Sequence, residues 1–376
     1  MRWWNIPSAI EEVGLEFFLG DDAAVEAAAR KVVDGARLDA SEGLAVYEKA
    51  SLHLLGALAD YAKRRVSGDD VYFCVNRHIN YSDYCVNECR FCAYYKKVGT
   101  AAGERLSVEQ FMERLGPGYR EFHVVGGCDP QLDLHYHLQA LSQMRKAFPY
   151  TRRQCYTAIE VDFIARNAGL SVDETLGLMV GAGLEALPGG GAEIFDPEIR
   201  KRICPNKIGG DEWLDVHRKA HNMGIKSNCT MLYGHIEERR HRISHLIRLR
   251  ELQDETGGFL AFIPLPFHPE NTGFSDLPGP DGVEDLRTIA ICRIMLDNIS
   301  HIKAFWIMLG LKLAQVALHF GADDLDGTVV EEIITHRAGA RTPIGISYDE
   351  MVRLIRDAGL VPVERDTFYE IYWRWE

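Results

Sequence analysis

Residues 84–93 have the sequence Tyr84-Cys85-Val86-Asn87-Glu88-Cys89-Arg90-Phe91-Cys92-Ala93, in which three cysteines follow the spacing C-x3-C-x2-C. Iron–sulfur clusters are normally bound by four Cys thiolates. Three thiolates in one short loop can therefore bind three irons of a cubane cluster and leave the fourth iron to an outside ligand. We expect Cys85, Cys89 and Cys92 to bind a [4Fe–4S] cluster that takes part in chemistry.

A structural zinc is the alternative for these cysteines, because closely spaced Cys pairs are common zinc ligands. Zinc needs four ligands, which usually come from two separated pairs. The remaining cysteines are single: Cys74, Cys128, Cys155, Cys204, Cys229 and Cys292. A histidine could complete a Cys3His site, so zinc stays open here. Disulfides are less favoured, because nothing marks the chain as secreted.

The wider pattern predicts an α/β fold. Apolar residues at three- and four-residue spacing predict helices up to about residue 67. Short β-rich runs then alternate with amphipathic helices. The expected strands are Tyr72–Ile79, Glu121–Val125, Gln154–Ile159, Leu184–Leu187, Lys226–Leu232, Phe259–Ile263, Ile299–Phe305 and a short one near Asp324–Leu325. About eight such units predict a TIM-type (βα)8 barrel with parallel strands.

We divide the chain into an N-terminal helical extension (1–70), the barrel (71–340) and a C-terminal helical and strand extension (341–376). The 376 residues are 47% hydrophobic and carry a net charge of −13. This charge argues against a nucleic-acid partner, because phosphate binding needs clustered Lys and Arg. Met1–Trp4 begin no long apolar stretch, and Lys312 and Gln315 interrupt the most apolar region. We therefore expect a cytoplasmic protein without a membrane partner.

The cysteine motif, with Phe91 before its last Cys, resembles that of the radical S-adenosylmethionine (SAM) superfamily. Further blocks narrow the resemblance. They are Asn76–Asn80, Ala93–Tyr95, Val124–Gly127, Thr157–Glu160, Leu187–Glu193, Met231–Glu237, Pro264–Pro269 and Gly321–Thr328. In this order they are similar to the aminofutalosine synthases of the futalosine route to menaquinone, over about residues 40–341.

The resemblance implies a radical SAM transferase in which SAM chelates the open iron. A 5′-deoxyadenosyl radical would add to a small-molecule substrate, the enolpyruvyl benzoate ether 3-[(1-carboxyvinyl)oxy]benzoate. Aryl migration and decarboxylation would then give 6-amino-6-deoxyfutalosine. An electron donor such as flavodoxin or ferredoxin would serve the cluster. The resemblance also implies that both extensions pack on the barrel.

Several residues become candidate SAM contacts through this resemblance. Phe91 would approach the adenine, and the pair Gly126 and Gly127 would meet the methionine end, although a tight turn explains two glycines equally well. Glu193 is the preferred acid for SAM. Glu160 is a second candidate, with a structural ion pair as its alternative role.

Polar residues at strand ends are the catalytic candidates, because a barrel places its active site where strands end. His78, Thr157, His235 and His268 have this position. Two histidine pairs with helical spacing, His217/His221 and His241/His245, lack the Glu of a zinc-protease signature. We take both pairs as surface residues. Asp323, Asp324 and Asp326 are expected to order the last barrel loop.

Other functions remain possible at this stage. The dehypoxanthine futalosine cyclases and the tyrosine-using synthases of deazaflavin biosynthesis share several blocks, but tend to have Asn at the position of His78. Cys128 and Asp129 depart from the family pattern, so they receive no role. A different class is a zinc-stabilised barrel that binds a metabolite without radical chemistry.

Overall fold

Two sheets, parallel except for one edge strand of the smaller sheet, form the centre of the computed structural model, which describes residues 8–329, 333–339 and 341–375. The larger sheet contains, in order, β2 (Asn76–Ile79), β3 (Glu121–Val124), β4 (Arg152–Cys155), β5 (Ala186–Leu187), β6 (Lys226–Tyr233), β7 (Phe259–Pro266) and β8 (His301–Ile302). The smaller sheet has the order β11 (Ile371–Arg374), β10 (Val361–Arg365), β1 (Asp70–Cys74) and β9 (Asp324–Gly327). Met1–Trp4 and the predicted boundary at residue 340 lie outside the described residues.

The two sheets are joined into a ring. Only Val75 separates β1 from β2, so one extended segment pairs with β9 through Tyr72 and Asp324, and with β3 through Asn76 and Glu121. A bridge between Lys303 and Asp324 links the end of β8 to β9. Eight parallel strands therefore follow one another around the ring, which confirms the predicted (βα)8 barrel.

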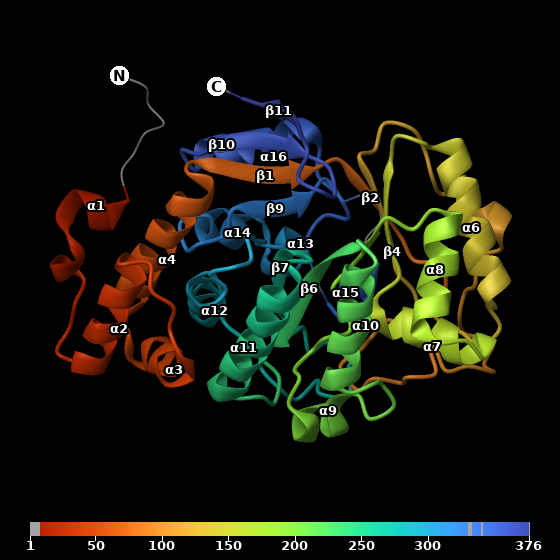
Figure 1. Cartoon of the computed structure of the whole chain (residues 1–376), viewed down its shortest axis with the longest axis horizontal. Helices are drawn as coiled ribbons and strands as arrows, with labels where there is room; N and C mark the ends of the chain where they lie inside the picture. The colour runs from red at the N-terminus through yellow and green to blue at the C-terminus, as the bar shows by residue number, and fades with distance from the viewer. Residues whose placement is uncertain (1–7, 330–332, 340, 376) are drawn as a thin grey trace.

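Helices cover the outside of this ring (Figure 1). The helices that follow the barrel strands are α5 (Val108–Glu113), α6 (Leu134–Ala147), α7 (Ala158–Ala168), α8 (Val172–Ala182), α9 (Pro197–Ile203), α10 (Gly210–Asn222), α11 (Arg239–Thr256), α12 (Gly282–Met295), α13 (Trp306–Leu309), α14 (Leu311–Ala317) and α15 (Ile334–Arg337). Ser107 and Ser171 begin α5 and α8 with capping boxes, in which the Ser hydroxyl accepts from the backbone three residues on. No helix among the described residues is long and apolar enough to span a membrane.

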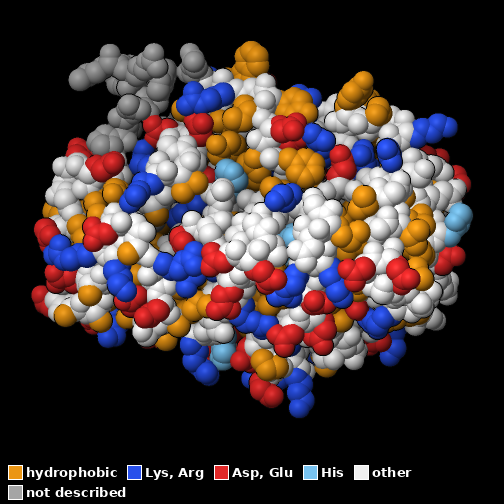
Figure 2. Space-filling view, in the orientation of Figure 1, with side chains coloured by type: hydrophobic (Ala, Val, Ile, Leu, Met, Phe, Trp, Pro, Cys, Tyr) orange, Lys and Arg blue, Asp and Glu red, His pale blue; other side chains and the backbone are white. Residues whose placement is uncertain are grey.

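Both extensions pack on the barrel, as predicted. The N-terminal helices are α1 (Ala9–Val13), the short 3-10 helix Leu15–Phe17, α2 (Ala23–Val33), α3 (Ala40–Lys49) and α4 (Leu52–Ser67). Helix α4 packs along α12, and α3 contacts α11 and α12 (Figure 1). At the C-terminus, α16 (Tyr348–Asp357) packs on β10, and β10 pairs with β1. Figure 2 shows acidic and basic side chains intermixed over one face.

Two expectations are corrected by the structure. The predicted strand Gln154–Ile159 ends at Cys155, because the Thr157 side chain caps the start of α7. His217, His221 and His245 are buried rather than on the surface. Ser227 Oγ lies 2.8 Å from a ring nitrogen of both His217 and His221, and His245 Nε2 lies 2.9 Å from the Thr230 carbonyl oxygen. Hydrogen bonds to these ring nitrogens allow the imidazoles to be buried.

Candidate active site

A cavity of about 300 Å³ lies at the carboxyl ends of the barrel strands. Nine of the twelve predicted site residues line it: His78, Cys85, Cys89, Phe91, Cys92, Gly126, Gly127, Thr157 and Glu160. Each belongs to a strand end or to the loop or helix start that follows one, so the barrel topology gathers residues that are far apart in sequence. The described lining does not include Glu193, His235 or His268.

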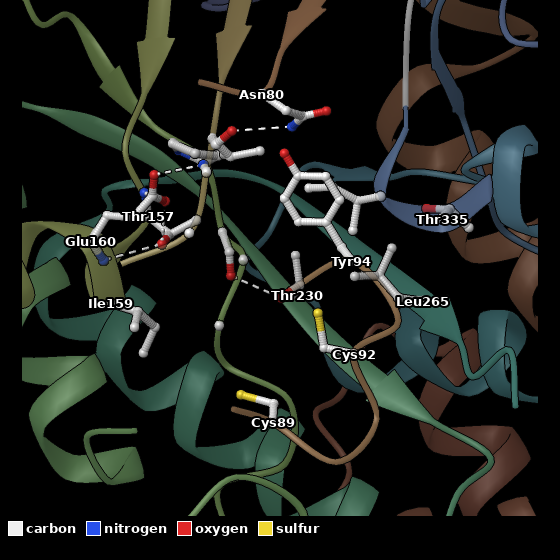
Figure 3. Close-up of a pocket in the computed structure, with 18 of the residues that line it drawn as sticks. Asn80, Cys89, Cys92, Tyr94, Thr157, Ile159, Glu160, Thr230, Leu265 and Thr335 are labelled. Atoms are coloured by element: carbon white, nitrogen blue, oxygen red, sulfur yellow. Dashed lines mark hydrogen bonds between the residues drawn. The ribbon is translucent and has the colours of Figure 1, made fainter. Parts of the chain in front are cut away.

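The cysteine loop is held by its own backbone. The Cys85 N–H donates to the Lys96 carbonyl at 3.1 Å, and the Arg90 N–H donates to the Ile203 carbonyl at 2.9 Å. Figure 3 shows the Cys89 and Cys92 sulfurs on the cavity side of the loop. All three cysteines are free thiols. Three thiols that form no disulfide therefore line one cavity, and all three come from a single loop that is held by backbone hydrogen bonds.

These sulfurs fit an iron–sulfur cluster better than a zinc ion. A zinc site gathers four ligands around one ion, whereas a cubane gives each thiolate its own iron. Within the part of the chain that the structure describes, no group of three or more His, Cys, Asp or Glu side chains could hold a metal ion. The three thiols remain a donor set suited to a cubane, in which each thiolate binds its own iron.

The surroundings of the three thiols differ. A hydrogen bond with the Cys128 side chain lowers the pKa of Cys85 to about 6. Burial raises the pKa of Cys89 and Cys92, and the Lys207 ammonium acts against that rise. Cys128 also lines the cavity, and its sulfur accepts from Asn87 Nδ2 at 3.3 Å. A position that departs from the family pattern thus touches one of the three cysteines expected to bind the cluster.

Gly126 and Gly127 let the turn after β3 approach the cysteine loop. A Cβ on Gly127 would lie 2.1 Å from the Tyr84 carbonyl oxygen, and one on Gly126 would lie 2.7 Å from the Tyr81 ring. The Gly127 N–H donates to the Ser82 carbonyl at 2.8 Å. The pair is therefore required by close backbone approach, whether or not it also contacts a ligand.

Glu160 is a buried hydrogen-bond acceptor that joins three segments at the cavity wall. Its carboxylate accepts from the Tyr81 hydroxyl at 2.8 Å, from Gly126 N at 2.9 Å and from Thr157 N at 2.7 Å. Burial raises the pKa of Glu160, and these hydrogen bonds act in the opposite direction. The carboxylate forms no ion pair with any described residue. Thr157, the N-cap of α7, also donates its hydroxyl to Glu160 at 2.6 Å.

Lys207 is a cavity residue that the sequence analysis did not single out. Its Nζ lies 2.5 Å from Glu193 Oε1 and 5.1 Å from the centre of the Phe91 ring. Burial opposes its charge, but Cys89 and Glu193 raise the pKa of Lys207 well above its ordinary value. Glu193, predicted to contact SAM, thus meets the cavity through Lys207. No local motif marks Lys207, because only the folded loop after α9 brings it to the cluster end.

The four catalytic candidates are not placed together. His78 and Thr157 line the cavity. The His235 ring is buried beside Glu237, with Nδ1 2.9 Å from Oε2, and His268 Nε2 lies 3.0 Å from the Met308 carbonyl oxygen. Neither of these two belongs to the described lining, and their catalytic roles stay predictions.

The inner end of the cavity, away from the cysteines, contains His78, His123 and Asp326. The rings of His78 and His123 are stacked, with centroids 4.4 Å apart. Lys303 Nζ donates to Asp326 Oδ1 at 2.7 Å. Asp323 pairs with Arg293 and Asp324 with Arg365, each at 2.7 Å. The three aspartates thus form buried ion pairs, and Asp326 also lines the cavity.

Comparisons with known proteins agree with this geometry. Residues 79–249 match the Radical SAM superfamily, and residues 256–375 match the CofH/MqnC C-terminal region. Aminodeoxyfutalosine synthase of Streptomyces coelicolor is 41% identical over 362 residues, covering 92% of this chain and 94% of that protein. The synthase of Thermus thermophilus is 39% identical over 356 residues, covering 93% and 96%.

Two other comparisons extend the picture. The 5-amino-6-(D-ribitylamino)uracil–L-tyrosine 4-hydroxyphenyl transferase of Methanopyrus kandleri is 38% identical over 359 residues, covering 93% of this chain and 96% of that protein. Among solved structures, methylornithine synthase superposes with a TM-score of 0.71 at 18% identity, covering 89% and 97% of the two chains. The hydrogenase maturase HydG gives 0.70 at 16% identity, covering 95% and 80%. These structures establish the fold alone.

Proposed function

Because the chain belongs to the radical SAM superfamily, as an enzyme that uses a [4Fe–4S] cluster and SAM, we propose that it catalyses the aminofutalosine synthase reaction. The deoxyadenosyl group of SAM is joined to the methylene of 3-[(1-carboxyvinyl)oxy]benzoate, the aryl group migrates from oxygen to carbon, and the carboxylate leaves as carbon dioxide or bicarbonate. The product is 6-amino-6-deoxyfutalosine. The observation that carries this proposal is the similarity to two aminodeoxyfutalosine synthases along nearly the whole chain.

Cys85, Cys89 and Cys92 would hold the cluster. The cluster supplies the electron that cleaves SAM into methionine and a 5′-deoxyadenosyl radical, chemistry that side chains cannot perform. Lys207, beside Phe91 at the same end, offers a buried positive charge to the carboxylate of SAM. Glu160 fixes the Gly126 turn against the cysteine loop. An electron donor such as flavodoxin or ferredoxin would reduce the cluster.

The rest of the cavity would hold the substrate and exclude water. Leu265, Phe305 and Met308 supply an apolar wall, and Thr157 and Thr230 supply hydroxyl groups. Figure 3 shows Leu265 and Thr230 around the same space as the two labelled cysteines. Holding the alkene close to the deoxyadenosyl carbon is the main contribution that the protein can make to an addition step.

The charges around the cavity favour a dianionic substrate over a zwitterion. Tyrosine carries an ammonium group, which needs a carboxylate partner in a buried site. Both carboxylates in the described lining already have partners, since Glu160 accepts four hydrogen bonds and Asp326 accepts from Lys303. The enol ether carries two carboxylates instead, and two imidazoles stand at the inner end.

The tyrosine-using transfer is the second candidate, because the Methanopyrus transferase is nearly as similar as the synthases. Dehypoxanthine futalosine cyclisation is a third candidate, from the match to the CofH/MqnC C-terminal region. All three reactions use the same cluster and SAM, so only the substrate separates them.

A substrate panel tests the proposal. Reconstituted protein is incubated without oxygen with dithionite and SAM, and separately with the enol ether, with dehypoxanthine futalosine, or with tyrosine and the ribityl-uracil. We expect a new product by mass spectrometry with the enol ether alone, and none without dithionite. A product formed only with tyrosine or only with dehypoxanthine futalosine would contradict the proposal.

A further inference from the structure

His123, on strand β3, has no role in the function proposed above, yet it lines the cavity at the inner end. The parallel register places it opposite His78 on β2. Their rings stack with centroids 4.4 Å apart and planes inclined by 17°. The two imidazoles thus form a face-to-face stack on neighbouring strands of the cavity wall, whereas Cys85, Cys89 and Cys92 lie in the loop beyond β2.

One edge of the His123 ring faces a carboxylate. Its Nδ1 lies 3.8 Å from Glu121 Oε1. The other ring nitrogen, Nε2, lies on the opposite edge of the imidazole. In the described part of the chain, no hydrogen bond is formed by Nε2, although the ring is only partly exposed. A ligand in the cavity can therefore reach a polar atom of His123 that has no protein partner there.

Of the described carboxylates near His123, two are paired with Lys or Arg side chains and one is not. Asp326 pairs with Lys303 and Asp324 with Arg365. Glu121 accepts from the Thr367 hydroxyl at 2.7 Å, but among the described residues no Lys or Arg lies within ion-pair distance of it. Burial raises the pKa of Glu121, but interactions with His123, Lys303 and Arg365 lower it by more. The resulting pKa of Glu121 is about 2. His123 thus faces an ionised carboxylate that has no other close cation.

The cavity-lining side chains that can carry a positive charge fall into two groups, one beside the cysteines and one on strands β2 and β3. Lys207 lies at the cysteine end, where it contacts Glu193 and Phe91. Other than Lys207, the described lining residues able to carry a positive charge are His78 and His123. The same lining includes Leu265, Phe305 and Met308, whose apolar side chains suit an aromatic ring. The inner end therefore suits an aryl group that carries an anionic substituent.

We infer that His123 is a specificity residue whose Nε2 binds the carboxylate of an aryl carboxylate ligand, with His78 stacked against its ring. The inference rests on the proposed function in one respect, since the enol ether proposed there carries such a benzoate group. The charged and titratable groups that surround His123 are Glu121, His78, Asp326, Lys303 and Arg365.

Binding without turnover tests this site. The probes are 3-methoxybenzoate and its neutral isostere 3-methoxybenzamide, titrated calorimetrically into reconstituted holoenzyme with SAM and no reductant. We expect the benzoate to bind about tenfold more tightly than the amide, as one charge-assisted hydrogen bond provides.

The variant His123→Gln should weaken benzoate binding about tenfold, while amide binding stays unchanged. His53→Gln, at an exposed position on α4, is the matched control and should keep the wild-type preference. Equal binding of the two probes by wild-type protein would overturn the inference even if His123→Gln failed to fold. So would an unchanged benzoate preference in folded His123→Gln.

The inference and the proposed function can fail separately. A benzoate preference that depends on His123, in a protein that forms no adduct with the enol ether, would contradict the proposed reaction and support the carboxylate site. Adduct formation with equal binding of benzoate and benzamide would support the reaction and overturn the role of His123.

Discussion

Lys207 Nζ lies 2.5 Å from Glu193 Oε1, and this buried ion pair stands at the cysteine end of the cavity. The pair joins the loop after α9 to the glycine-rich segment after β5. Breaking a buried ion pair by removing one partner leaves an uncompensated charge, which costs about 3 to 5 kcal/mol. The pair is therefore both a structural link and the nearest positive charge to the proposed SAM site.

Lys207→Met should lower the free energy of unfolding by about 3 kcal/mol, because Glu193 is left buried and unpaired. Urea unfolding of the variant measures the loss. The double variant Lys207→Met/Glu193→Gln should regain at least about half of it, since no charge is then stranded. Lys201→Met, at an exposed position of α9, is the control. If the double variant were as unstable as Lys207→Met, the broken ion pair could not be the cause of the lost stability.

Cys89→Ala should abolish cluster binding and turnover. After reconstitution, iron should fall from about four per chain to near zero, and the broad absorbance near 400 nm should disappear. Cys229→Ala removes a buried thiol whose sulfur donates to the Ala261 carbonyl on β7, and it should keep its iron. Turnover by Cys89→Ala, or loss of iron in folded Cys229→Ala, would refute the assignment of ligands.

Gly127→Ala should disturb the cysteine loop, because a methyl group there would press on the backbone next to Cys85. The new methyl group would meet the Tyr84 carbonyl oxygen, so the backbone has to shift at a cost of about 1 to 3 kcal/mol. We expect lower iron content together with lower stability. Gly177→Ala, in α8 with no atom closer than 3.9 Å, should be neutral or stabilising. Normal iron loading in Gly127→Ala would show that the close approach is dispensable.

His137 should make the protein sensitive to acid. Burial lowers the pKa of His137 to about 4 in the folded state, below the ordinary value of about 6.5. As pH falls through this window, the unfolded chain takes up a proton that the folded chain does not, so stability falls. Between pH 7 and pH 5 this one group should cost about 2 kcal/mol.

His137→Phe tests the acid effect, because the ring packs among Tyr81, Tyr136 and Tyr156. The variant should lose less stability than wild type between pH 7 and pH 5 in urea unfolding, by about 2 kcal/mol. The exposed His53→Gln should follow the wild-type curve. Identical pH dependence of wild type and His137→Phe would contradict the account.

The barrel and many of its cavity residues could be predicted from the sequence, because strand and helix alternation and helix capping are visible in short stretches of sequence. Alternating strands and helices specify a parallel barrel, and the barrel gathers its strand ends, so Gly126, a candidate by resemblance, and Thr157 both line the cavity. Thr157 and Glu160 also form a capping box that is visible in the sequence. This box explains why the predicted strand after Gln154 stops early.

The missed residues depend on tertiary packing. Lys207 comes from a loop with no pattern of its own, and only the fold brings it beside Glu193. His123 could have been found from strand register, since it pairs with His78 and shares its inward face. The buried histidines of α10 and α11 were misjudged because spacing alone does not show which helix face meets the barrel.

The fate of the adenosine carbons tests the central claim most directly. Reconstituted protein with dithionite and the enol ether is given SAM labelled throughout its adenosyl carbons, and the products are analysed by mass spectrometry. The account predicts that the label appears in a compound that also contains the aryl group, with the mass of 6-amino-6-deoxyfutalosine. Label confined to 5′-deoxyadenosine would mean hydrogen abstraction in place of addition, and would contradict the proposed function.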